Sequence, residues 1–372
     1  MTPLEMFDKA FYRDGIIPKI TLEEVVDCEL ENLSAWCVKI KEYHACNYFA
    51  RSRNNVDNMT EKVIVTGGSG RLGGHVMTAL RAGYGATALD IKPPPGDVPF
   101  IATDILDLPG LTRAFTGQAA VIHLAGYDDG DGPNEQAYMA TNVQGAWNVF
   151  QAAEDAGVPH VVVASSTAAL GLDHERAPDY LPVDETHALR TTGTYGLGKQ
   201  LMETMARHYA ARGKMHVICL RPTLIVRPEK EAQILAQLAL PDPDSNSPGC
   251  SSDAAARNAV APYGALSATR TYVRSTDAAR GFVAALKYRA HRFDIFNLAA
   301  PDGIGRPETL ARMAAIHETM PPVRDPQLYQ ADPYASVLDV RHARDDLGWR
   351  ADGDWRDVVA RHKSKTTMET SS

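Results

Sequence analysis

A glycine-rich turn constrains this chain more than any other feature of the sequence. The apolar run Val63–Val65 leads into TGGSGRLG at 66–73, and a helix-length segment follows. Gly67 permits a tight turn from strand to helix, Gly70 lets the backbone approach a pyrophosphate, and Gly73 lets helix and strand pack closely. The turn therefore predicts a βαβ unit whose first helix holds the diphosphate of a dinucleotide.

From residue 61 onward, short apolar runs alternate with helix-length segments. The predicted strands lie at 63–65, 86–89, 100–102, 120–124, 160–164 and 216–220, and the predicted helices at 71–83, 108–116, 134–156 and 194–212. Runs such as Val161–Ala164 are apolar throughout, as expected for a parallel sheet covered on both faces. The predicted fold class is α/β, a Rossmann-type doubly wound parallel sheet with a smaller, mostly C-terminal substrate-binding region.

Composition and charge exclude several classes of protein. The chain has 372 residues, of which 44% are hydrophobic and 23% charged, which fits two domains or one large α/β unit. No apolar run reaches the roughly 18 residues that span a bilayer, and the N-terminus, with Glu5 and Asp8, is unlike a secretory signal. A net charge of −8 makes nucleic acids and anionic membranes poor partners.

Cysteine usage points to a reducing compartment. The five cysteines are odd in number and form no CxxC pair, so neither a disulfide framework nor a zinc site is expected. The even spacing of Cys28, Cys37 and Cys46 matches no usual metal-ligand pattern. We therefore expect a cytoplasmic protein without a bound metal.

Composition also divides the chain into parts. Residues 1–58 hold one of the 28 glycines and form an N-terminal extension, either an added arm without a catalytic part or a packing, oligomerisation or regulatory segment. A stretch rich in Pro, Ser and Asp at 240–262 marks a surface loop or lid. The expected parts are a Rossmann domain over 59–226 with a return at about 271–298, a substrate-binding region over 227–270 and 299–362, and a polar tail over 363–372.

An acidic residue ends the second predicted strand. Asp90 follows Gly67 by 23 residues, and a carboxylate at that place accepts both ribose hydroxyls of an adenosine and repels a 2′-phosphate. Lys92 lies close enough to weaken this preference. NAD is therefore expected as the cofactor rather than NADP.

A tyrosine and a lysine open the predicted helix at 194–212. Tyr195 and Lys199 are four residues apart and share one helix face. A phenol with a pKa near 10 is a poor base at neutral pH, but a cation within about 6 Å lowers that pKa. Lys199 is expected to do this and to donate to ribose hydroxyls, so that Tyr195 exchanges a proton with a substrate hydroxyl or carbonyl.

Hydroxyl side chains end the predicted strand at 160–164. The run Ser165-Ser166-Thr167 offers a hydroxyl that can orient a substrate oxygen toward Tyr195. Serine and threonine also cap turns, and this is the more usual role for Ser165 and Thr167.

These features together resemble the extended short-chain dehydrogenase/reductases, the NAD-dependent epimerase/dehydratase family, over about residues 61–350. The resemblance rests on a set of short motifs. They are TGGSGRLG at 66–73, Asp90, Asp104-Ile105, HLAG at 123–126, NVQGAWNV at 142–149, Ser165-Ser166, YGLGK at 195–199, Arg221-Pro222, RTYVRSTD at 270–277 and LGW at 347–349.

The resemblance implies roles by position: contact with the adenine after the third strand, support of the active-site helix by Asn142, and contact with the nicotinamide by Pro222. Ser166 lies four residues before Leu170-Gly171, where the family has Tyr-Gly, and this register makes Ser166 the catalytic hydroxyl. The implied cofactor contacts are Gly67, Gly70, Arg71, Leu72, Gly73, Asp90, Asp104, Ile105, Leu124, Ala125, Gly126, Asn142, Tyr195, Lys199 and Pro222. The implied catalytic residues are Ser166, Tyr195 and Lys199, and the substrate contacts are Ser166, Thr167 and Arg270.

The chain departs from the family pattern at two places. After Arg221-Pro222, nucleotide-sugar epimerases carry an asparagine and a Tyr-Gly-Pro turn, whereas this chain reads TLIVRP at 223–228. No acid pair follows Ser166, which disfavours dehydration. Arg270 matches the family arginine that grips a substrate phosphate, and it also fits a surface ion pair.

Several other polar residues have ordinary interpretations. Asp128, Asp129 and Asp131 are expected to be solvated loop acids, although they also suit a metal or sugar hydroxyls. His123 is expected to pack at a strand end rather than act as a base. Nothing in the sequence fixes the geometry of His174 or His187.

The predicted function is NAD-dependent hydride transfer at a carbinol of a sugar or sugar derivative, either as an epimerase or as a simple oxidoreductase. The departures from the nucleotide-sugar pattern favour simple oxidation or reduction. The alternatives are an NAD(P)H-dependent reductase of a non-sugar carbonyl substrate and a non-catalytic dinucleotide-sensing protein, against which the complete set of catalytic residues argues. The partner is a small-molecule substrate, and the resemblance is compatible with a homodimer through the helices at 134–156 and 194–212.

Overall fold

The structure is a computed structural model that describes residues 61–172, 176–231, 234, 269–305 and 307–358. The expected extension at 1–58, the loop at 240–262 and the tail at 363–372 lie outside the described residues.

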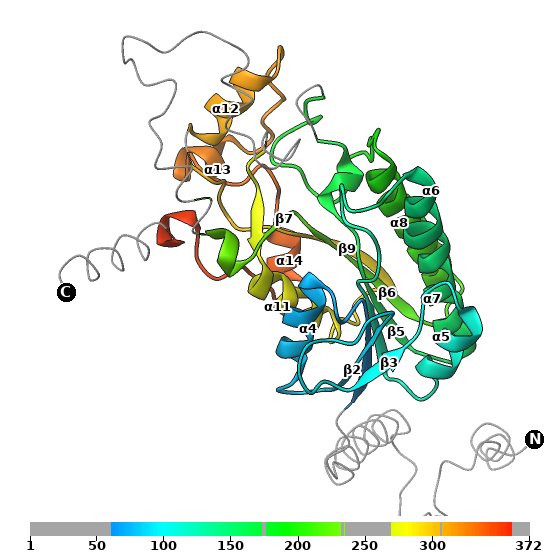
Figure 1. Cartoon of the computed structure of the whole chain (residues 1–372). Helices are drawn as coiled ribbons and strands as arrows, with labels where there is room; N and C mark the ends of the chain where they lie inside the picture. Colours follow the sequence, from blue (N-terminus) through cyan, green and yellow to red (C-terminus); the bar gives the residue numbers. More distant parts are fainter. Residues whose placement is uncertain (1–60, 173–175, 232–233, 235–268, 306, 359–372) are drawn as a thin grey trace, which may run out of the picture. The chain divides into compact units, whose positions relative to one another are not determined.

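Seven parallel strands form one sheet (Figure 1). Their order is β3-β2-β1-β4-β5-β6-β9, so the direction in which strands are added reverses between β1 and β4. Side chains of the central strands are fully buried on both faces, as Val63 and Ile64 show, and this explains their continuous apolar sequences. The strands are β1 (Lys62–Thr66), β2 (Gly85–Asp90), β3 (Phe100–Ala102), β4 (Ala120–His123), β5 (His160–Ala164), β6 (His216–Pro222) and β9 (Phe293–Leu298).

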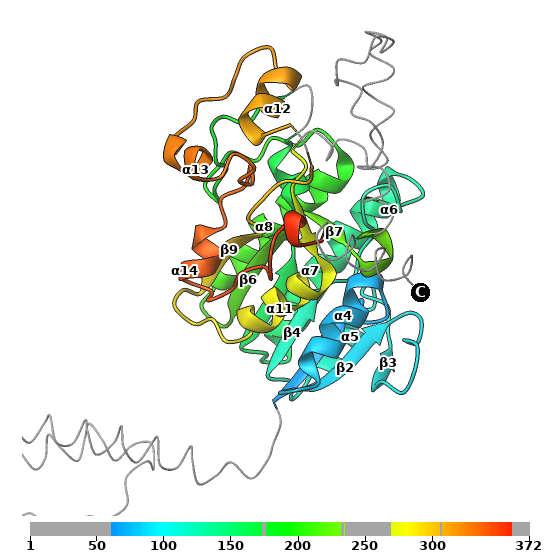
Figure 2. The ribbon, with the colours of Figure 1, turned by 90° about the vertical axis from the view of Figure 1, so that its left-hand side faces the viewer.

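Helices cover both faces of the sheet (Figures 1 and 2). On one face, α4 (Arg71–Leu80) packs against α11 (Ser275–Ala285), with Val76 and Phe282 in the shared core. On the other face lie α5 (Leu108–Phe115), α7 (Gly145–Asp155) and α8 (Thr194–Ala211), with Phe150 and Tyr209 in a second core. The sheet is therefore doubly wound, and the predicted fold class is confirmed.

The single helix expected over 134–156 is divided into three parts. A short helix, α6 (Glu135–Tyr138), runs into a π-helical stretch at Met139–Gln144 and then into α7. The π-helical stretch holds Asn142, which is fully buried. A π turn widens the helix by one residue and is frequent at functional sites.

A smaller part of the chain packs beyond the sheet around two further cores. One core holds Leu181, Met313 and Leu338, and the other holds Tyr272 and Trp355. Its elements are the 3-10 turn Thr167–Leu170, β7 (Leu224–Val226), β8 (Tyr272–Arg274), α12 (Thr309–Ile316) and α13 (Pro326–Ala331). The helix α14 (Arg341–Asp345) instead packs against β9, with Ala343 in the same core as Phe282. The strand β8 pairs only with β7, in a separate parallel sheet, so the chain rejoins the layers of the large sheet at α11 rather than at β8. In the part of the chain that the structure describes, no helix is long and apolar enough to cross a membrane.

Two neighbouring glycines of α4 test the close packing of helix on strand. A Cβ atom at Gly73 would lie 2.1 Å from the Gly67 carbonyl oxygen, whereas nothing lies within 4 Å of a Cβ at Gly74. We expect Gly73→Ala to lower the free energy of unfolding by about 2 kcal/mol because backbone must move. The control Gly74→Ala should raise it by about 0.5–1 kcal/mol, since alanine favours a helix interior. Urea unfolding measures both, and equal effects would contradict this packing.

Candidate active site

The carboxyl ends of five parallel strands bring the predicted site residues to one edge of the sheet. Gly67, Asp90, Leu124, Ser166 and Pro222 follow or end β1, β2, β4, β5 and β6. The reversal of strand order between β1 and β4 lies at this edge. Ligands of doubly wound sheets bind at such a point.

The turn after β1 is shaped for a phosphate. Gly67 has a φ of +71°, and a Cβ there would lie 2.6 Å from the Ala125 backbone nitrogen, so only glycine fits. Gly70 is the N-cap of α4 and has no side chain to bond the first helical N–H groups, and no acidic residue occupies the first turn. Free N–H groups at a helix N-terminus suit an anionic group. The residues present thus fit the diphosphate of a dinucleotide.

Asp90 is held beside this turn. Its Oδ2 accepts a hydrogen bond from the Ser69 backbone nitrogen at 3.2 Å, and its Oδ1 accepts one from the Ile91 nitrogen at 2.8 Å. The Ser69 hydroxyl donates to the Lys92 carbonyl oxygen at 2.6 Å. The carboxylate is therefore oriented at the end of β2, next to the turn.

Two predicted cofactor contacts differ in their surroundings. Asp104 is exposed and its Oδ1 accepts a hydrogen bond from the Leu106 nitrogen at 2.9 Å. Ile105 is buried, and its Cδ1 atom would lie 2.4 Å from a Cβ at Gly145 in α7. The side chain of Ile105 thus packs into the core between the sheet and α7.

Asn142 connects the loop after β4 with the π-helical stretch by hydrogen bonds and lies close to α8. Its Oδ1 accepts from the Tyr127 nitrogen at 2.8 Å, and its Nδ2 donates to the Tyr127 carbonyl oxygen at 2.9 Å. A Cβ at Gly198 in α8 would lie 3.4 Å from the Asn142 Cβ, so α8 passes close to it. The π-helical stretch therefore fixes both the loop and the helix that bears Tyr195.

Ser166, Tyr195 and Lys199 come together at this edge. The Ser166 hydroxyl lies beside Tyr195 and accepts a hydrogen bond from the Ala168 nitrogen at 3.1 Å. The Lys199 Nζ lies 5.5 Å from the centre of the Tyr195 ring and donates to the Ala164 carbonyl oxygen at 2.6 Å. Burial lowers the pKa of Lys199 to about 8.

The electrostatic setting of Tyr195 differs from the expectation. Burial raises the pKa of Tyr195 above its usual value, and the negative charge of Asp128 adds to this, while the hydrogen bond with Ser166 opposes it. Burial destabilises the phenolate of Tyr195, and this effect is larger than any lowering of the pKa by Lys199. The chain's own groups therefore do not produce the lowered pKa that the sequence led us to expect. Within the chain, the neutral phenol is the favoured form.

Asp128 is exposed, as expected for a solvated loop acid, and it also lies beside the candidate site. It forms an ion pair with Arg71 at 3.3 Å, Asp131 pairs with the same guanidinium, and Asp128 lies near enough to Tyr195 to raise its pKa. Asp128 follows β4 closely in the sequence, and loops after parallel strands lie at the edge that also carries the turn after β1. This position in the sequence is the feature that could have identified Asp128 as a neighbour of the site. Arg71 accordingly bridges the phosphate turn to the loop beside Tyr195.

The remaining candidates occupy other surroundings. Ser165 donates to Glu203 at 2.6 Å, and Thr167 is buried in the 3-10 turn. Arg270 precedes β8, has a φ of +51° and lies near Arg312, whose pKa burial and this neighbouring charge lower to about 10. The Arg312 guanidinium donates to the carbonyl oxygens of Pro307 and Thr269, at 3.0 and 3.2 Å. His187 is buried and accepts from the Asp179 nitrogen at 2.9 Å, while His174 lies outside the described residues, among which no group of three or more metal-ligating side chains forms.

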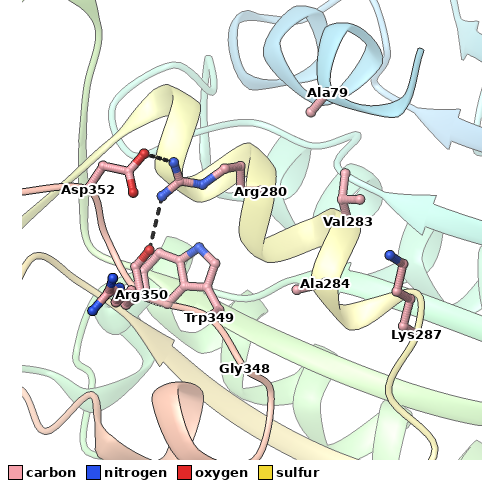
Figure 3. Close-up of a pocket in the computed structure, with 9 residues that line it drawn as sticks. All are labelled: Ala79, Arg280, Val283, Ala284, Lys287, Gly348, Trp349, Arg350 and Asp352. Carbon is pink, nitrogen blue, oxygen red and sulfur yellow. Dashed lines mark hydrogen bonds and ion pairs between the residues drawn. The ribbon is translucent and has the colours of Figure 1, made fainter. Parts of the chain in front are cut away.

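A surface hollow of about 480 Å³ lies between α4, α11 and residues 348–352 (Figure 3). Arg280 crosses it to reach Asp352 and the Arg350 carbonyl oxygen. Trp349, from the LGW motif, donates to the Asp277 carbonyl oxygen at 2.9 Å. None of the predicted site residues lines this hollow, so the motif fastens the C-terminal segment to α11 rather than forming the active site.

His123 is packed at the end of β4 as expected. It is fully buried, its Nδ1 lies 2.7 Å from the Thr66 hydroxyl, and burial together with the charge of Lys199 lowers its pKa to about 3. In the unfolded chain an imidazole titrates near 6.5. Between these two values the unfolded state binds a proton that the folded state excludes, so stability falls as the pH falls.

His123→Asn tests this linkage because asparagine can keep the hydrogen bond to Thr66. We expect the loss of unfolding free energy between pH 7 and pH 5 to be smaller by about 2 kcal/mol in the variant, from a shift of about 1.5 pH units at about 1.4 kcal/mol each. Urea unfolding at the two pH values measures it. An equal loss in both proteins would show that His123 is not held neutral.

Comparisons with known proteins agree with this geometry. Residues 63–299, more than half of the chain, match the model of the NAD dependent epimerase/dehydratase family. An NAD-dependent glucose-6-phosphate dehydrogenase of Haloferax volcanii is 30% identical over 179 residues, which cover 44% of this chain and 68% of the relative. The human UDP-glucose 4-epimerase is 27% identical over 327 residues, covering 79% and 92%.

Solved structures show the same fold. The UDP-glucose 4-epimerase of Brucella ovis, in complex with NAD, superposes with a TM-score of 0.58 at 22% identity, over 80% of this chain and 96% of that one. A short-chain dehydrogenase/reductase superfamily protein from Agrobacterium tumefaciens with bound NAD also gives 0.58 at 22% identity, over 84% and 100%. At this identity the likeness concerns the fold.

Proposed function

The chain belongs to the NAD-dependent epimerase/dehydratase family and is therefore an NAD-dependent enzyme, and from this premise we propose that it transfers hydride at a carbinol of a sugar or sugar derivative with Tyr195 as the acid and base. The observation that carries the proposal is that the Ser166 hydroxyl lies beside the Tyr195 hydroxyl, with the Lys199 Nζ 5.5 Å from the centre of the tyrosine ring, at the edge that holds the phosphate turn. A substrate oxygen placed between these two hydroxyls exchanges its proton with Tyr195.

The residues divide the work as follows. Ser166 hydrogen-bonds the substrate oxygen and orients it. Tyr195 donates its proton to a carbonyl oxygen in reduction and takes the proton of the hydroxyl in oxidation. Lys199, with a pKa of about 8, is mostly protonated at neutral pH and holds a positive charge near the Tyr195 ring. When bound, NAD supplies the carbon that accepts or returns the hydride.

Asp90 supports NAD over NADP. Its carboxylate is oriented by the Ser69 and Ile91 nitrogens at the end of β2. A fixed negative charge there accepts ribose hydroxyls and repels a 2′-phosphate. The other cofactor contacts that the sequence implies belong to the same proposal.

The substrate proposed is a free or simply substituted sugar. One relative is named for NAD-dependent oxidation of glucose 6-phosphate and another for epimerisation of UDP-glucose. The segment 223–228 lacks the asparagine and the Tyr-Gly-Pro turn that accompany nucleotide sugars. Arg270, next to Arg312, suits a phosphate or carboxylate of the substrate. The substrate-binding region is proposed over 227–270 and 299–362, and the Rossmann domain over 59–226 with a return at about 271–298.

Tyr195→Phe is the direct test of the acid–base role. The variant keeps the ring and loses the proton, so we expect turnover to fall by at least about 1,000-fold while NAD binding is retained. The readout is NADH formation or product analysis with free aldoses, uronates, sugar phosphates and UDP-glucose. The matched control is Tyr209→Phe on the same helix, whose hydroxyl donates to Gln151 at 3.0 Å and which should stay active. Full turnover by Tyr195→Phe would remove the tyrosine from the chemistry.

A further inference from the structure

Three segments that carry proposed site residues meet at one buried carboxylate, that of Glu203. Glu203 lies four residues after Lys199 on the same face of α8. Its Oε1 accepts hydrogen bonds from the Ser165 hydroxyl at 2.6 Å and from the Arg221 Nε at 2.7 Å. Its Oε2 accepts from the Arg221 Nη2 at 2.8 Å. Glu203 and Arg221 are only 3% and 1% exposed, so no solvent replaces these bonds.

Each partner of Glu203 is the chain neighbour of a residue of the site. Ser165 stands between Ala164, whose carbonyl oxygen binds the Lys199 Nζ, and Ser166. Arg221 directly precedes Pro222 at the end of β6. A shift of the carboxylate therefore moves the ends of β5 and β6 relative to α8.

The Arg221 guanidinium reaches a fourth segment. Its Nη1 donates to the Glu185 carbonyl oxygen at 3.2 Å, and the Glu185 carboxylate in turn accepts from the Asn297 nitrogen of β9 at 2.8 Å. The Arg221 guanidinium therefore connects the edge of the sheet with the segment that leads from the 3-10 turn to α8.

Stability alone does not account for a charged pair at this place. The apolar side chains of α8, such as Met202 and Ala206, already pack in the core against Val163 and Cys219. Apolar contact is non-directional, so it holds the helix on the sheet without fixing its rotation. A buried ion pair costs desolvation, and apolar residues of similar volume often replace one without loss of stability. The three short hydrogen bonds are directional and fix how α8 sits on the strand ends.

We propose that Glu203 and Arg221 are positioning residues that set the place of Tyr195 and Lys199 on α8 relative to Ser166 on β5. They do so through Ser165 and the strand ends, without touching the substrate. This inference rests on the proposed function of Tyr195, Lys199 and Ser166.

The same carboxylate acts on Lys199 through its charge. Four groups face the amine: Glu203 on α8, Asp128 after β4, neutral His123 at the end of β4, and the Tyr195 ring. Burial lowers the pKa of Lys199, and the negative charges of Asp128 and Glu203 oppose it. Removing the charge of Glu203 therefore lowers this pKa further, and the ammonium form is lost at a lower pH.

Two variants and one control separate positioning from simple stability. Glu203→Gln removes one charge and leaves Arg221 buried without its partner. The double variant Glu203→Gln/Arg221→Met removes both charges at similar volume, so that it keeps the fold if the single variant does not. The control is Glu154→Gln, since Glu154 is a buried carboxylate on α7 that pairs with Arg212 at 2.5 Å just past the far end of α8.

The first readout requires neither cofactor nor substrate. The Lys199 signal in protein labelled with ¹³Cε-lysine is assigned by its loss in Lys199→Arg and titrated by NMR. The wild-type midpoint should lie near 8. In Glu203→Gln it should fall by at least about 0.5 pH unit, in the double variant it should fall by less because the positive charge of Arg221 is lost too, and in Glu154→Gln it should stay where it is. An unmoved midpoint in the folded Glu203 variants overturns the coupling to Lys199.

The second readout is the split between kcat and KM on the substrate that the wild type turns over best in the screen above. We expect kcat to fall by about 100-fold in the double variant, as a displacement of about 1 Å does, with NAD affinity and KM little changed. The control variant should lose stability and keep kcat. A folded double variant with wild-type kcat overturns the positioning role.

Failure of the proposed function has a different signature. A wild-type protein that turns over no carbinol with NAD contradicts the proposed function. The Lys199 midpoint in the Glu203 variants then still decides whether this carboxylate governs the lysine.

Discussion

The close approach of two backbone segments at Gly67 and Ala125 sets the geometry on which the site depends. A left-handed glycine turns the chain from β1 into α4 within van der Waals contact of the loop after β4. This contact aligns the N-terminus of α4 with the strand ends. Gly73 adds a second close approach, because its lack of a side chain lets the helix pack directly on the turn. Because β1 and β4 are adjacent strands of a parallel sheet, their loops open to the same side. The residues after β4, β5 and β6 therefore lie at the same edge of the sheet as this turn.

The helix α8 places the reactive groups against that frame. Its first turns carry Tyr195 and Lys199, and Glu203 follows one turn later on the same face. Burial destabilises the charged forms of these groups, and polar partners compensate for this. The Ala164 carbonyl oxygen accepts a hydrogen bond from the lysine, and Arg221 donates hydrogen bonds to the glutamate. The tyrosine is different, because burial and Asp128 favour its neutral form. Within the chain alone, Tyr195 therefore holds its proton more tightly than a solvated phenol does.

The sequence predicts those parts that depend on local pattern. Apolar runs, the glycine turn and the i, i+4 spacing of Tyr195 and Lys199 follow from short stretches of chain, and the doubly wound sheet follows from their alternation. The π-helical stretch around Asn142 cannot be predicted from the sequence, because no glycine or proline interrupts the helical pattern just before it. The pairing of Glu203 with Arg221, the ion pair of Asp128 with Arg71 and the effect of burial on Tyr195 arise only when distant segments meet.

The central claim is that the turn after β1 and the carboxylate of Asp90 bind NAD, and the dinucleotide content of the freshly purified protein tests it most directly. The protein is denatured, any released dinucleotide is identified and counted, and protein freed of dinucleotide is titrated with NAD and NADP. We expect about one NAD site per chain, with weaker binding of NADP. NAD that survives dialysis would favour a cofactor recycled in place, as in epimerisation, and reversible binding would favour a dehydrogenase or reductase. A protein that neither carries nor binds a dinucleotide would contradict the account.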